Sequence, residues 1–283
     1  MAEAARMRAV LPPIIPIISD LIGQSPGTIS LAQGVVGYAP PPQALAALGA
    51  IGASPAEHQY PPDEGLPELI EALGGKLERE NRIPTGTDSR ILVTAGSNMA
   101  FSHAVCAIAD PGDEIVLQAP YYFNHHMAVM IAGCQPVCVA TDASDQLQPD
   151  AIERAITPRT RAVVTISPNN PTGAVYPRDA LVAVNQMCAR RGIYHVHDEA
   201  YEYFLYDGAR HFSPGSIPGA APHTISLFTF SKSYAMAAWR VGYMVIPAHL
   251  EEAVYKIQDT VIISAARASQ QVALAALQTG AAY

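Results

Sequence analysis

Three features are missing from this sequence of 283 residues, and each absence removes a class of protein. The four cysteines form no CxxC pair, which argues against a disulfide framework or a thiolate zinc site and favours a reducing compartment. Lysine and arginine form no extended run and the formal net charge is −8, so we expect no nucleic-acid partner. No apolar run reaches the roughly 18 residues of a membrane span, so we expect no membrane partner either.

The first 45 residues are rich in proline and glycine and predict an irregular arm that lies against another part of the protein. Within them, the apolar stretch 11–23 contains Pro12, Pro13 and Pro16, which should break a helix, and no clear cleavage site follows. A secretory leader is therefore not expected. Together with the cysteine pattern, this predicts a cytoplasmic protein.

Short apolar and β-branched runs dominate the rest of the chain and alternate with helical or turn-rich segments. This alternation predicts an α/β fold with three layers (α/β/α) around a mostly parallel sheet. The expected helices are 66–80, 98–109, 122–132, 149–156 and 177–191. The expected strands are 90–94, 113–118, 135–140, 161–167, 192–197, 223–230 and 241–246. In such sheets, ligands collect beyond the carboxyl ends of the strands.

Lys232 is the most informative of the residues that follow a strand. It lies between an apolar run and a turn of small residues, in FTFSKSYAMAA. Partial burial near another cation, such as Arg240, lowers the pKa of an amine and lets it react with an aldehyde. A lysine that extends its ammonium group from a strand end into solvent would have the same sequence context. The neighbouring residues must therefore decide its role.

Asp198, Asn170 and Tyr201 also follow expected strands. A carboxylate at the end of an apolar strand is costly unless it pairs with a positive group, and a protonated pyridine nitrogen is one such group. A salt bridge or a helix N-cap would also account for Asp198. Asn170 and Tyr201 offer an amide and a phenol to an oxygen on the same ring. The motif NNPTG would equally serve as a plain turn.

A phosphate group requires donors from several directions, preferably including the amides of a helix start. Gly96 allows close backbone approach directly before an expected helix. Tyr122 could stack on an aromatic ring, although packing is an equally ordinary role for a tyrosine. The remaining donors for a phosphate are Ser97, Asn98, Thr229, Ser231 and Arg240. Together with Lys232, Asp198, Asn170 and Tyr201, these donors predict pyridoxal phosphate as the cofactor.

The ordered motifs resemble the class I/II aminotransferases, fold-type I enzymes that bind pyridoxal phosphate. The resemblance extends over about residues 29–278. Its most specific part is the SKxxxxxxxR spacing of Lys232 and Arg240, joined to NPTG and DxxY in the family's order. It implies transfer of an amino group from an amino acid to a 2-oxo acid. A lyase, synthase or decarboxylase built on the same cofactor site stays open as an alternative.

The resemblance also implies roles for individual residues. The catalytic set is Lys232, which forms the Schiff base and carries a proton, Asp198, which pairs with the pyridinium, and Tyr201. Asn170 and Tyr201 contact the ring oxygen, Tyr122 stacks on the ring, and the phosphate is held by Ser97, Asn98, Thr229, Ser231 and Arg240.

Two further residues acquire roles only through the resemblance. Tyr60, in HQYPPDEG, matches a tyrosine that crosses a dimer interface to the neighbour's phosphate, which implies a homodimer. Gly34, in LAQGVVGY, matches a glycine whose backbone contacts the substrate carboxylate. The N-terminal arm would then lie at the active site or bridge two subunits.

The resemblance divides the chain into residues 1–45, an arm with part of a small domain, and residues 46–283, the large cofactor-binding domain. The family continues for on the order of a hundred residues beyond Tyr283, within the usual size of a domain. That part holds the arginine that binds the substrate's α-carboxylate. We therefore expect the C-terminal part of the small domain to be absent, as in a fragment or a natural short form. A cofactor-binding protein with little turnover is a further alternative.

Tyr122, His195 and His197 depart from the family's pattern. Tyr122 replaces the tryptophan of the aspartate-specific members, so a preference for aspartate is not supported. His195 and His197 are unusual in their strand. At a spacing of two they point to the same side and could bind zinc in a metal hydrolase. Asp198 would then face the other way, and no further zinc ligand is evident among the other histidines.

Overall fold

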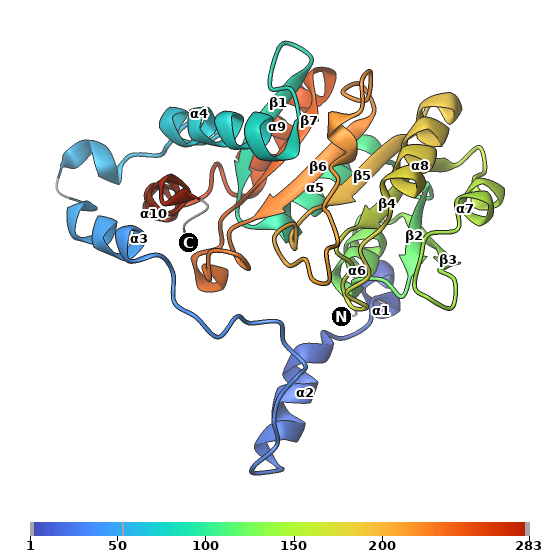
Figure 1. Cartoon of the computed structure of the whole chain (residues 1–283), viewed down its shortest axis with the longest axis horizontal. Helices are drawn as coiled ribbons and strands as arrows, with labels where there is room; N and C mark the ends of the chain where they lie inside the picture. Colours follow the sequence, from blue (N-terminus) through green and yellow to red (C-terminus); the bar gives the residue numbers. More distant parts are fainter. Residues whose placement is uncertain (1–2, 53, 281–283) are drawn as a thin grey trace.

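The protein is described by a computed structural model that covers residues 3–52 and 54–280. A seven-stranded sheet forms its centre, in the order β1-β7-β6-β5-β4-β2-β3 (Figure 1). The strands are β1 (Ser89–Thr94), β2 (Glu114–Ala119), β3 (Gln135–Ala140), β4 (Thr160–Ile166), β5 (Tyr194–Asp198), β6 (Thr224–Thr229) and β7 (Gly242–Pro247). All seven correspond to predicted strands.

Five neighbouring strands, β6-β5-β4-β2-β3, run parallel to one another. β7 is antiparallel to both of its neighbours, β6 and β1. The mostly parallel sheet is therefore confirmed. Since β1 then runs in the same direction as β6, the carboxyl ends of six strands lie at one edge of the sheet.

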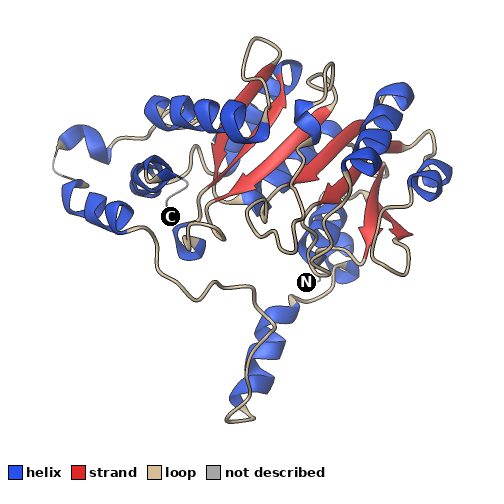
Figure 2. Cartoon of the chain, viewed as in Figure 1, coloured by secondary structure: helices blue, strands red, loops and turns tan. Residues whose placement is uncertain are grey.

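Helices cover both faces of the sheet, which confirms the three-layer architecture (Figure 2). The predicted helices correspond to α4 (Pro67–Lys76), which continues as a π-helical turn over Leu77–Asn81, and to α5 (Ser97–Ile108), α6 (Phe123–Ile131), α7 (Pro149–Ala155) and α8 (Arg178–Arg191). The helices that the sequence did not predict are α1 (Ala5–Ala9), α2 (Ile14–Gly23), α3 (Pro42–Ala47), α9 (Glu251–Val261) and α10 (Arg267–Gln278).

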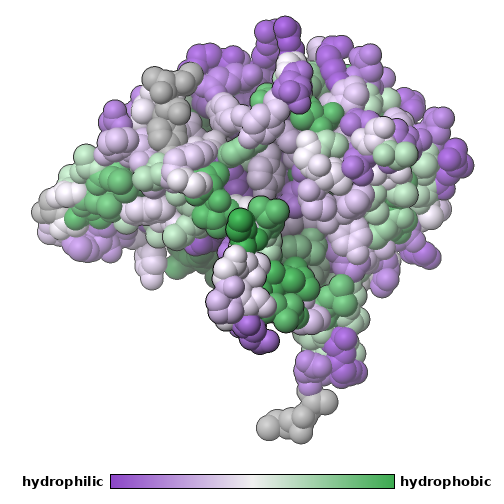
Figure 3. All heavy atoms as spheres, turned by 60° about the horizontal axis from the view of Figure 1, so that its bottom comes forward, coloured by the Kyte–Doolittle hydropathy of each residue, from purple (hydrophilic) through white to green (hydrophobic). Residues whose placement is uncertain are grey.

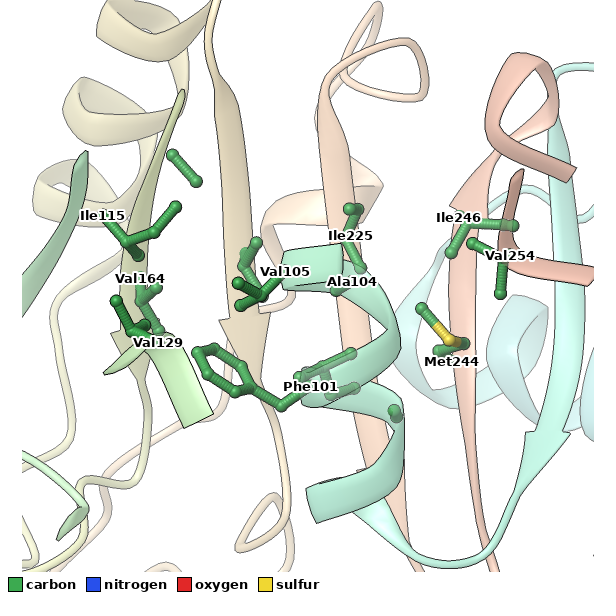
Figure 4. Packing of buried hydrophobic residues seen from close by; sticks show 14 of the residues in the cluster. Phe101, Ala104, Val105, Ile115, Val129, Val164, Ile225, Met244, Ile246 and Val254 are labelled. Carbon is green, nitrogen blue, oxygen red and sulfur yellow. The ribbon is translucent and has the colours of Figure 1, made fainter. Parts of the chain in front are cut away.

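The alternation of side chains along each strand places hydrophobic cores on both faces of the sheet. In β2, Ile115 and Leu117 pack under α5 and α6, whereas Val116 packs under α7 and α8. Figure 4 shows the first of these cores, where Phe101 and Val105 of α5 lie over the strands. Both faces are buried, so the strands are nearly continuous apolar runs, as parallel sheets require.

The prediction of an irregular N-terminal arm is wrong in part. α2 is helical although it contains Pro16, because a proline in the first turn of a helix removes an N–H that has no partner within the helix. α2 has no buried residue and projects away from the sheet (Figure 1). α1 lies against α6, and Ala44 of α3 is buried in a core shared with α4 and α10. The domain boundary at residue 45 stays a prediction.

In the part of the chain that is described, every helix is too short or too polar to cross a membrane.

Candidate active site

A cavity of about 650 Å³ opens beyond the carboxyl ends of the parallel strands. Eleven of the twelve predicted site residues line it. These are Gly34, Ser97, Asn98, Tyr122, Asn170, Asp198, Tyr201, Thr229, Ser231, Lys232 and Arg240. They come from segments that are up to about 200 residues apart in sequence, so the parallel strand ends gather them at one place.

The twelfth residue, Tyr60, does not line the cavity. Its side chain is 78% exposed, on a loop before α4. This position agrees with a role in another subunit's site, and that role stays a prediction.

One end of the cavity is built to accept an anion. Gly96 precedes α5 with a φ of +83°, and a Cβ at this position would lie 2.3 Å from Arg240 Nη2, so only glycine fits there. Gly242 is constrained as well, because its Cβ would lie 2.9 Å from the Ser97 amide nitrogen. These two glycines bring the start of α5 and the Arg240 guanidinium to the same point.

Two hydroxyl groups complete this end of the cavity. The Thr229 hydroxyl donates to Ser231 Oγ at 2.9 Å, and Arg240 Nη1 donates to the same oxygen at 3.3 Å. The first amides of a helix have no carbonyl partner within it, so the start of α5 adds free donors and a positive helix dipole. The arrangement matches the hydrogen-bonding needs of a phosphate.

Lys232 lies on the turn after β6, in the middle of the cavity. Its Nζ donates a hydrogen bond to the Gly34 carbonyl at 2.6 Å and lies 5.6 Å from the centre of the Tyr201 ring. Burial lowers the pKa of the Lys232 amine, and the charge of Arg240 lowers it further, whereas Asp198 acts in the opposite direction. The net shift favours the neutral, nucleophilic form of the amine.

Asp198 is the last residue of β5 and is only 3% exposed. One carboxylate oxygen accepts a hydrogen bond from the Ala200 amide at 2.9 Å. The other lies 3.1 Å from Nε2 of His125, a buried residue of α6 that stacks on Phe101. No lysine or arginine forms an ion pair with Asp198 among the described residues. A buried carboxylate in this setting favours a positive group beside it.

Tyr201 lies between Lys232 and Asn170. Its hydroxyl accepts a hydrogen bond from Asn170 Nδ2 at 3.4 Å. Burial raises the pKa of Tyr201 to about 12, and the charge of Asp198 acts in the same direction, so the phenol keeps its proton at neutral pH and can donate it to a ligand oxygen. A Cβ on Gly34 would lie 3.7 Å from this hydroxyl, which places the N-terminal segment against the same group.

Tyr122 precedes α6 and is held by two amide side chains. Its hydroxyl donates to Asn98 Oδ1 at 3.3 Å and accepts from Asn124 Nδ2 at 2.7 Å. These contacts fix the ring at the wall of the cavity. Sequence reasoning missed Asn124 as a lining residue, and it missed the contact of His125 with Asp198. The only signal was the cluster FNHH directly after Tyr122.

The N-terminal segment contributes residues that the sequence did not identify individually. Ile15, Leu31 and Gln33 line the cavity together with Gly34. The expectation that the arm lies at the active site therefore agrees with the cavity lining. No sequence pattern marks these residues, because their role depends on where the segment crosses the sheet edge.

His195 and His197 do point to the same side of β5, as predicted, but they share a hydroxyl. Thr165 Oγ1 lies 2.8 Å from His195 Nε2 and 2.6 Å from His197 Nδ1. Burial lowers the pKa of both imidazoles, that of His195 to about 3, so both are neutral. Among the described residues, the grouping that could hold a metal ion consists of Glu199, Glu202 and His211 and includes neither of them. Nothing in this geometry favours the metal hydrolase.

Three observations test whether these residues fit pyridoxal phosphate. The Gly96 cradle with its hydroxyl and guanidinium donors suits the phosphate. Asp198 is buried without a lysine or arginine partner among the described residues, which suits a pyridinium. The Lys232 amine has a lowered pKa and faces the cavity between these two groups, which suits the aldehyde. The donor set therefore fits the cofactor.

Comparisons with known proteins agree with this geometry. The family model for aminotransferase class I and II matches residues 26–283. The chain is 38% identical over 279 residues to aromatic aminotransferase ISS1 of Arabidopsis thaliana, which covers 96% of this chain and 69% of that protein. It is 40% identical over 221 residues to the aspartate/prephenate aminotransferase of Thermus thermophilus, covering 77% of this chain and 56% of that protein.

Solved structures show the same relationship. The aspartate aminotransferase from Thermus thermophilus with maleate superposes with a TM-score of 0.91 at 34% identity, covering 99% of this chain and 73% of that chain. N-succinyldiaminopimelate aminotransferase from Mycobacterium tuberculosis gives a TM-score of 0.92 at 30% identity, again covering 99% of this chain and 73% of that one. Sequence, fold and cavity agree, and the chain belongs to the class I and II aminotransferase family.

Proposed function

We propose that this chain is the pyridoxal-phosphate-binding part of an aminotransferase that moves an amino group between an amino acid and a 2-oxo acid. The observation that carries the proposal is the convergence of Lys232, Asp198 and the anion cradle at Gly96 on one cavity. Each group suits a different part of the cofactor, and membership of the family indicates the reaction class.

When bound, pyridoxal phosphate supplies an aldehyde for the amine and a ring that accepts the electrons released at the substrate's α-carbon. Arg240, Ser231 and the start of α5 bind its phosphate and fix its position. Asp198 would favour the protonated state of the ring nitrogen, and His125 Nε2 lies 3.1 Å from its carboxylate. Tyr122 covers one side of the ring.

Lys232 has two tasks in this proposal. Its neutral amine would hold the cofactor through the aldehyde, and the same Nζ, once free, would accept the α-proton of the substrate and give it back. The lowered pKa of Lys232 supports both tasks, because an ammonium group could neither attack an aldehyde nor accept a proton. Tyr201 and Asn170 orient the ring oxygen beside it.

A homodimer is part of the proposal. Large apolar side chains of the N-terminal segment are solvent-exposed in the single chain, including Ile29 at 85% and Leu31 at 94%. Figure 3, in which the bottom of Figure 1 comes forward, shows hydrophobic surface on this side of the molecule. We infer that a second copy covers this surface, and the family resemblance assigns the partner's Tyr60 to a cofactor phosphate in such a dimer. Sedimentation of the purified protein tests the assembly. The proposed compartment is the cytoplasm.

The proposed function is tested by a half-reaction. Purified protein is loaded with pyridoxal phosphate, single amino acids are added, and the cofactor's absorbance and the released 2-oxo acid are followed. A transaminase converts the absorbance band and releases one 2-oxo acid per site, and a second 2-oxo acid restores the band. Stable binding of the cofactor without conversion by any amino acid would leave a binding protein, and release of ammonia would indicate a lyase.

A further inference from the structure

A cluster of buried charged residues lies behind the cavity, on the far side of the turn that follows β5. Lys76, the last residue of α4, is 2% exposed. Its Nζ donates to Glu202 Oε1 at 2.5 Å and to Asn81 Oδ1 at 2.7 Å. It also lies 4.8 Å from the centre of the Phe228 ring. A buried ammonium group is held in one position by all of these contacts.

The two carboxylates of the cluster are held by several donors. Glu202 accepts a second hydrogen bond, from Asn81 Nδ2 at 2.7 Å. Glu199 is 1% exposed and accepts from the Ser213 hydroxyl and from His211 Nε2, the latter at 2.7 Å. Asn81 links the two carboxylates, because its Nδ2 also lies 3.4 Å from Glu199 Oε2. The cluster is therefore one connected network.

Glu199 and Glu202 flank Tyr201 in sequence, and their side chains face away from the cavity. Asp198 lines the cavity and Glu199 enters the cluster, as alternation along a strand end requires. The turn between them is compact, since the Glu202 amide donates to the Glu199 carbonyl at 3.1 Å and the Phe204 amide donates to the Tyr201 carbonyl at 2.8 Å. A shift of either glutamate would therefore move Tyr201.

The ligand types of Glu199, Glu202 and His211 would also suit a divalent cation. Lys76 already supplies the positive charge that such a cation would bring. Its ammonium group lies within the cluster at ion-pair distance from Glu202. Burying two carboxylates and a lysine costs desolvation free energy, so the cluster is a poor source of stability by itself. It is better explained by the segment that it holds in place.

We propose that Lys76 is a positioning residue for the active site, which holds the turn Glu199–Phe204 from behind and so fixes the Tyr201 hydroxyl beside Lys232 and Asn170. This inference rests on the proposed function for its effect on turnover. Its structural part, the order of the turn, can be tested without any substrate.

The main variant is Lys76→Met, which keeps most of the side-chain volume and removes the charge. Its matched control is Lys256→Met, because Lys256 pairs with Glu252 at 2.6 Å on the exposed surface of α9. A second variant, Lys76→Met with Glu202→Gln, leaves no unpaired carboxylate at position 202. It keeps the test possible if the single variant does not fold.

The first measurement is hydrogen exchange of the Glu202 and Phe204 amides in the cofactor-free protein. We expect at least about tenfold faster exchange at these two amides in both Lys76 variants, with the sheet unchanged and the Lys256 control like wild type. Wild-type exchange at both amides in a folded Lys76 variant contradicts the proposal. So does an increase spread evenly over the whole protein.

The second measurement uses the cofactor. The pH at which the absorbance of bound pyridoxal phosphate changes should shift in the Lys76 variants in the same direction as in Tyr201→Phe, because both changes weaken the same contact. The kcat should fall by about 10- to 100-fold with a smaller change in KM. If wild type turns over no amino acid, the proposed function fails while the exchange result still decides the role of Lys76. An unshifted absorbance transition in a folded variant would reject that role.

Discussion

Asp198 and Glu199 are neighbours in sequence, and both are buried carboxylates, yet they have opposite surroundings. Glu199 faces a network that contains its own cation, Lys76, and several neutral donors. Asp198 faces a cavity, and its side-chain partners are an imidazole and a backbone amide. Burial of a charge is costly unless a partner compensates it. The negative charge at the back of the turn, at Glu199, is therefore balanced by groups of the chain itself. The negative charge of Asp198, at the front, is arranged for a positive group that comes with a ligand.

The largest effect should come from removing the amine at the front. Lys232→Ala should lower turnover by at least about 10³-fold, because the nucleophile and the proton carrier are lost together. The apoprotein should unfold at the same temperature as wild type within a few degrees. Steady-state assays and thermal unfolding check this. Lys256→Ala serves as a control that removes an exposed lysine, and comparable losses in both variants would argue against a specific role for Lys232.

Two amide substitutions test the difference between the surroundings of Asp198 and those of Glu199. Asp198→Asn should lower kcat by about 10²- to 10³-fold, because the ring nitrogen loses its negative partner, and should change the unfolding free energy of the apoprotein by less than about 1 kcal/mol. Glu199→Gln should do the reverse and cost about 1–3 kcal/mol of stability, because the charge-assisted hydrogen bonds that Glu199 Oε2 accepts would be replaced by weaker bonds to a neutral amide oxygen. Equal stability losses in both variants, measured by urea unfolding, would show that the two faces do not differ as described.

The histidines on the back of β5 give a pH-dependent effect. Burial lowers the pKa of His195 to about 3, from an ordinary value of 6.5. A lowered pKa means that the unfolded chain binds a proton that the folded protein refuses, so stability present above pH 6.5 is lost as the pH falls. His195 alone should account for roughly 3 kcal/mol between pH 7 and pH 4. His195→Gln should flatten the dependence of the unfolding free energy on pH over this range. An unchanged slope would count against a neutral buried imidazole.

The smallest effect concerns Tyr60, which lies outside the cavity of its own chain. Tyr60→Phe should raise the Kd for pyridoxal phosphate by about 2- to 10-fold, the value of one hydrogen bond. The effect should be present in the dimer and vanish at dilutions where the chains dissociate. Quenching of the single tryptophan, Trp239, which precedes Arg240, offers a direct readout of cofactor binding. The same loss in dissociated protein would place Tyr60 in its own subunit's site.

The sequence predicted the sheet well, because buried parallel strands are marked by continuous β-branched runs. The largest difference is at β5, which begins at Tyr194 rather than at residue 192. Helices α9 and α10 were missed although apolar residues such as Val254 and Val272 mark their buried faces. The helix α2 was not predicted, because a proline within a helix usually breaks it, whereas Pro16 lies in the first turn, where a proline is acceptable.

Eleven of the residues that line the cavity were predicted, because ordered motifs identify them one by one. Their supports were not. The contact of His125 with Asp198 joins residues that are 73 positions apart in the sequence (198 − 125), and the Lys76–Glu202 pair spans 126 positions. A lysine at the end of an amphipathic helix is normally exposed to solvent, so nothing in the sequence marks Lys76 as buried. Only the three-dimensional packing of α4 behind the turn after β5 reveals its partners.

The central claim is that the Lys232 amine attaches the cofactor. The most direct measurement is to incubate the purified chain with pyridoxal phosphate, reduce it with borohydride and map the modified peptide by mass spectrometry. The account predicts one cofactor per chain, located on Lys232 and absent from Lys232→Ala. A stable adduct on another lysine, such as Lys256, with Lys232 unmodified would contradict it.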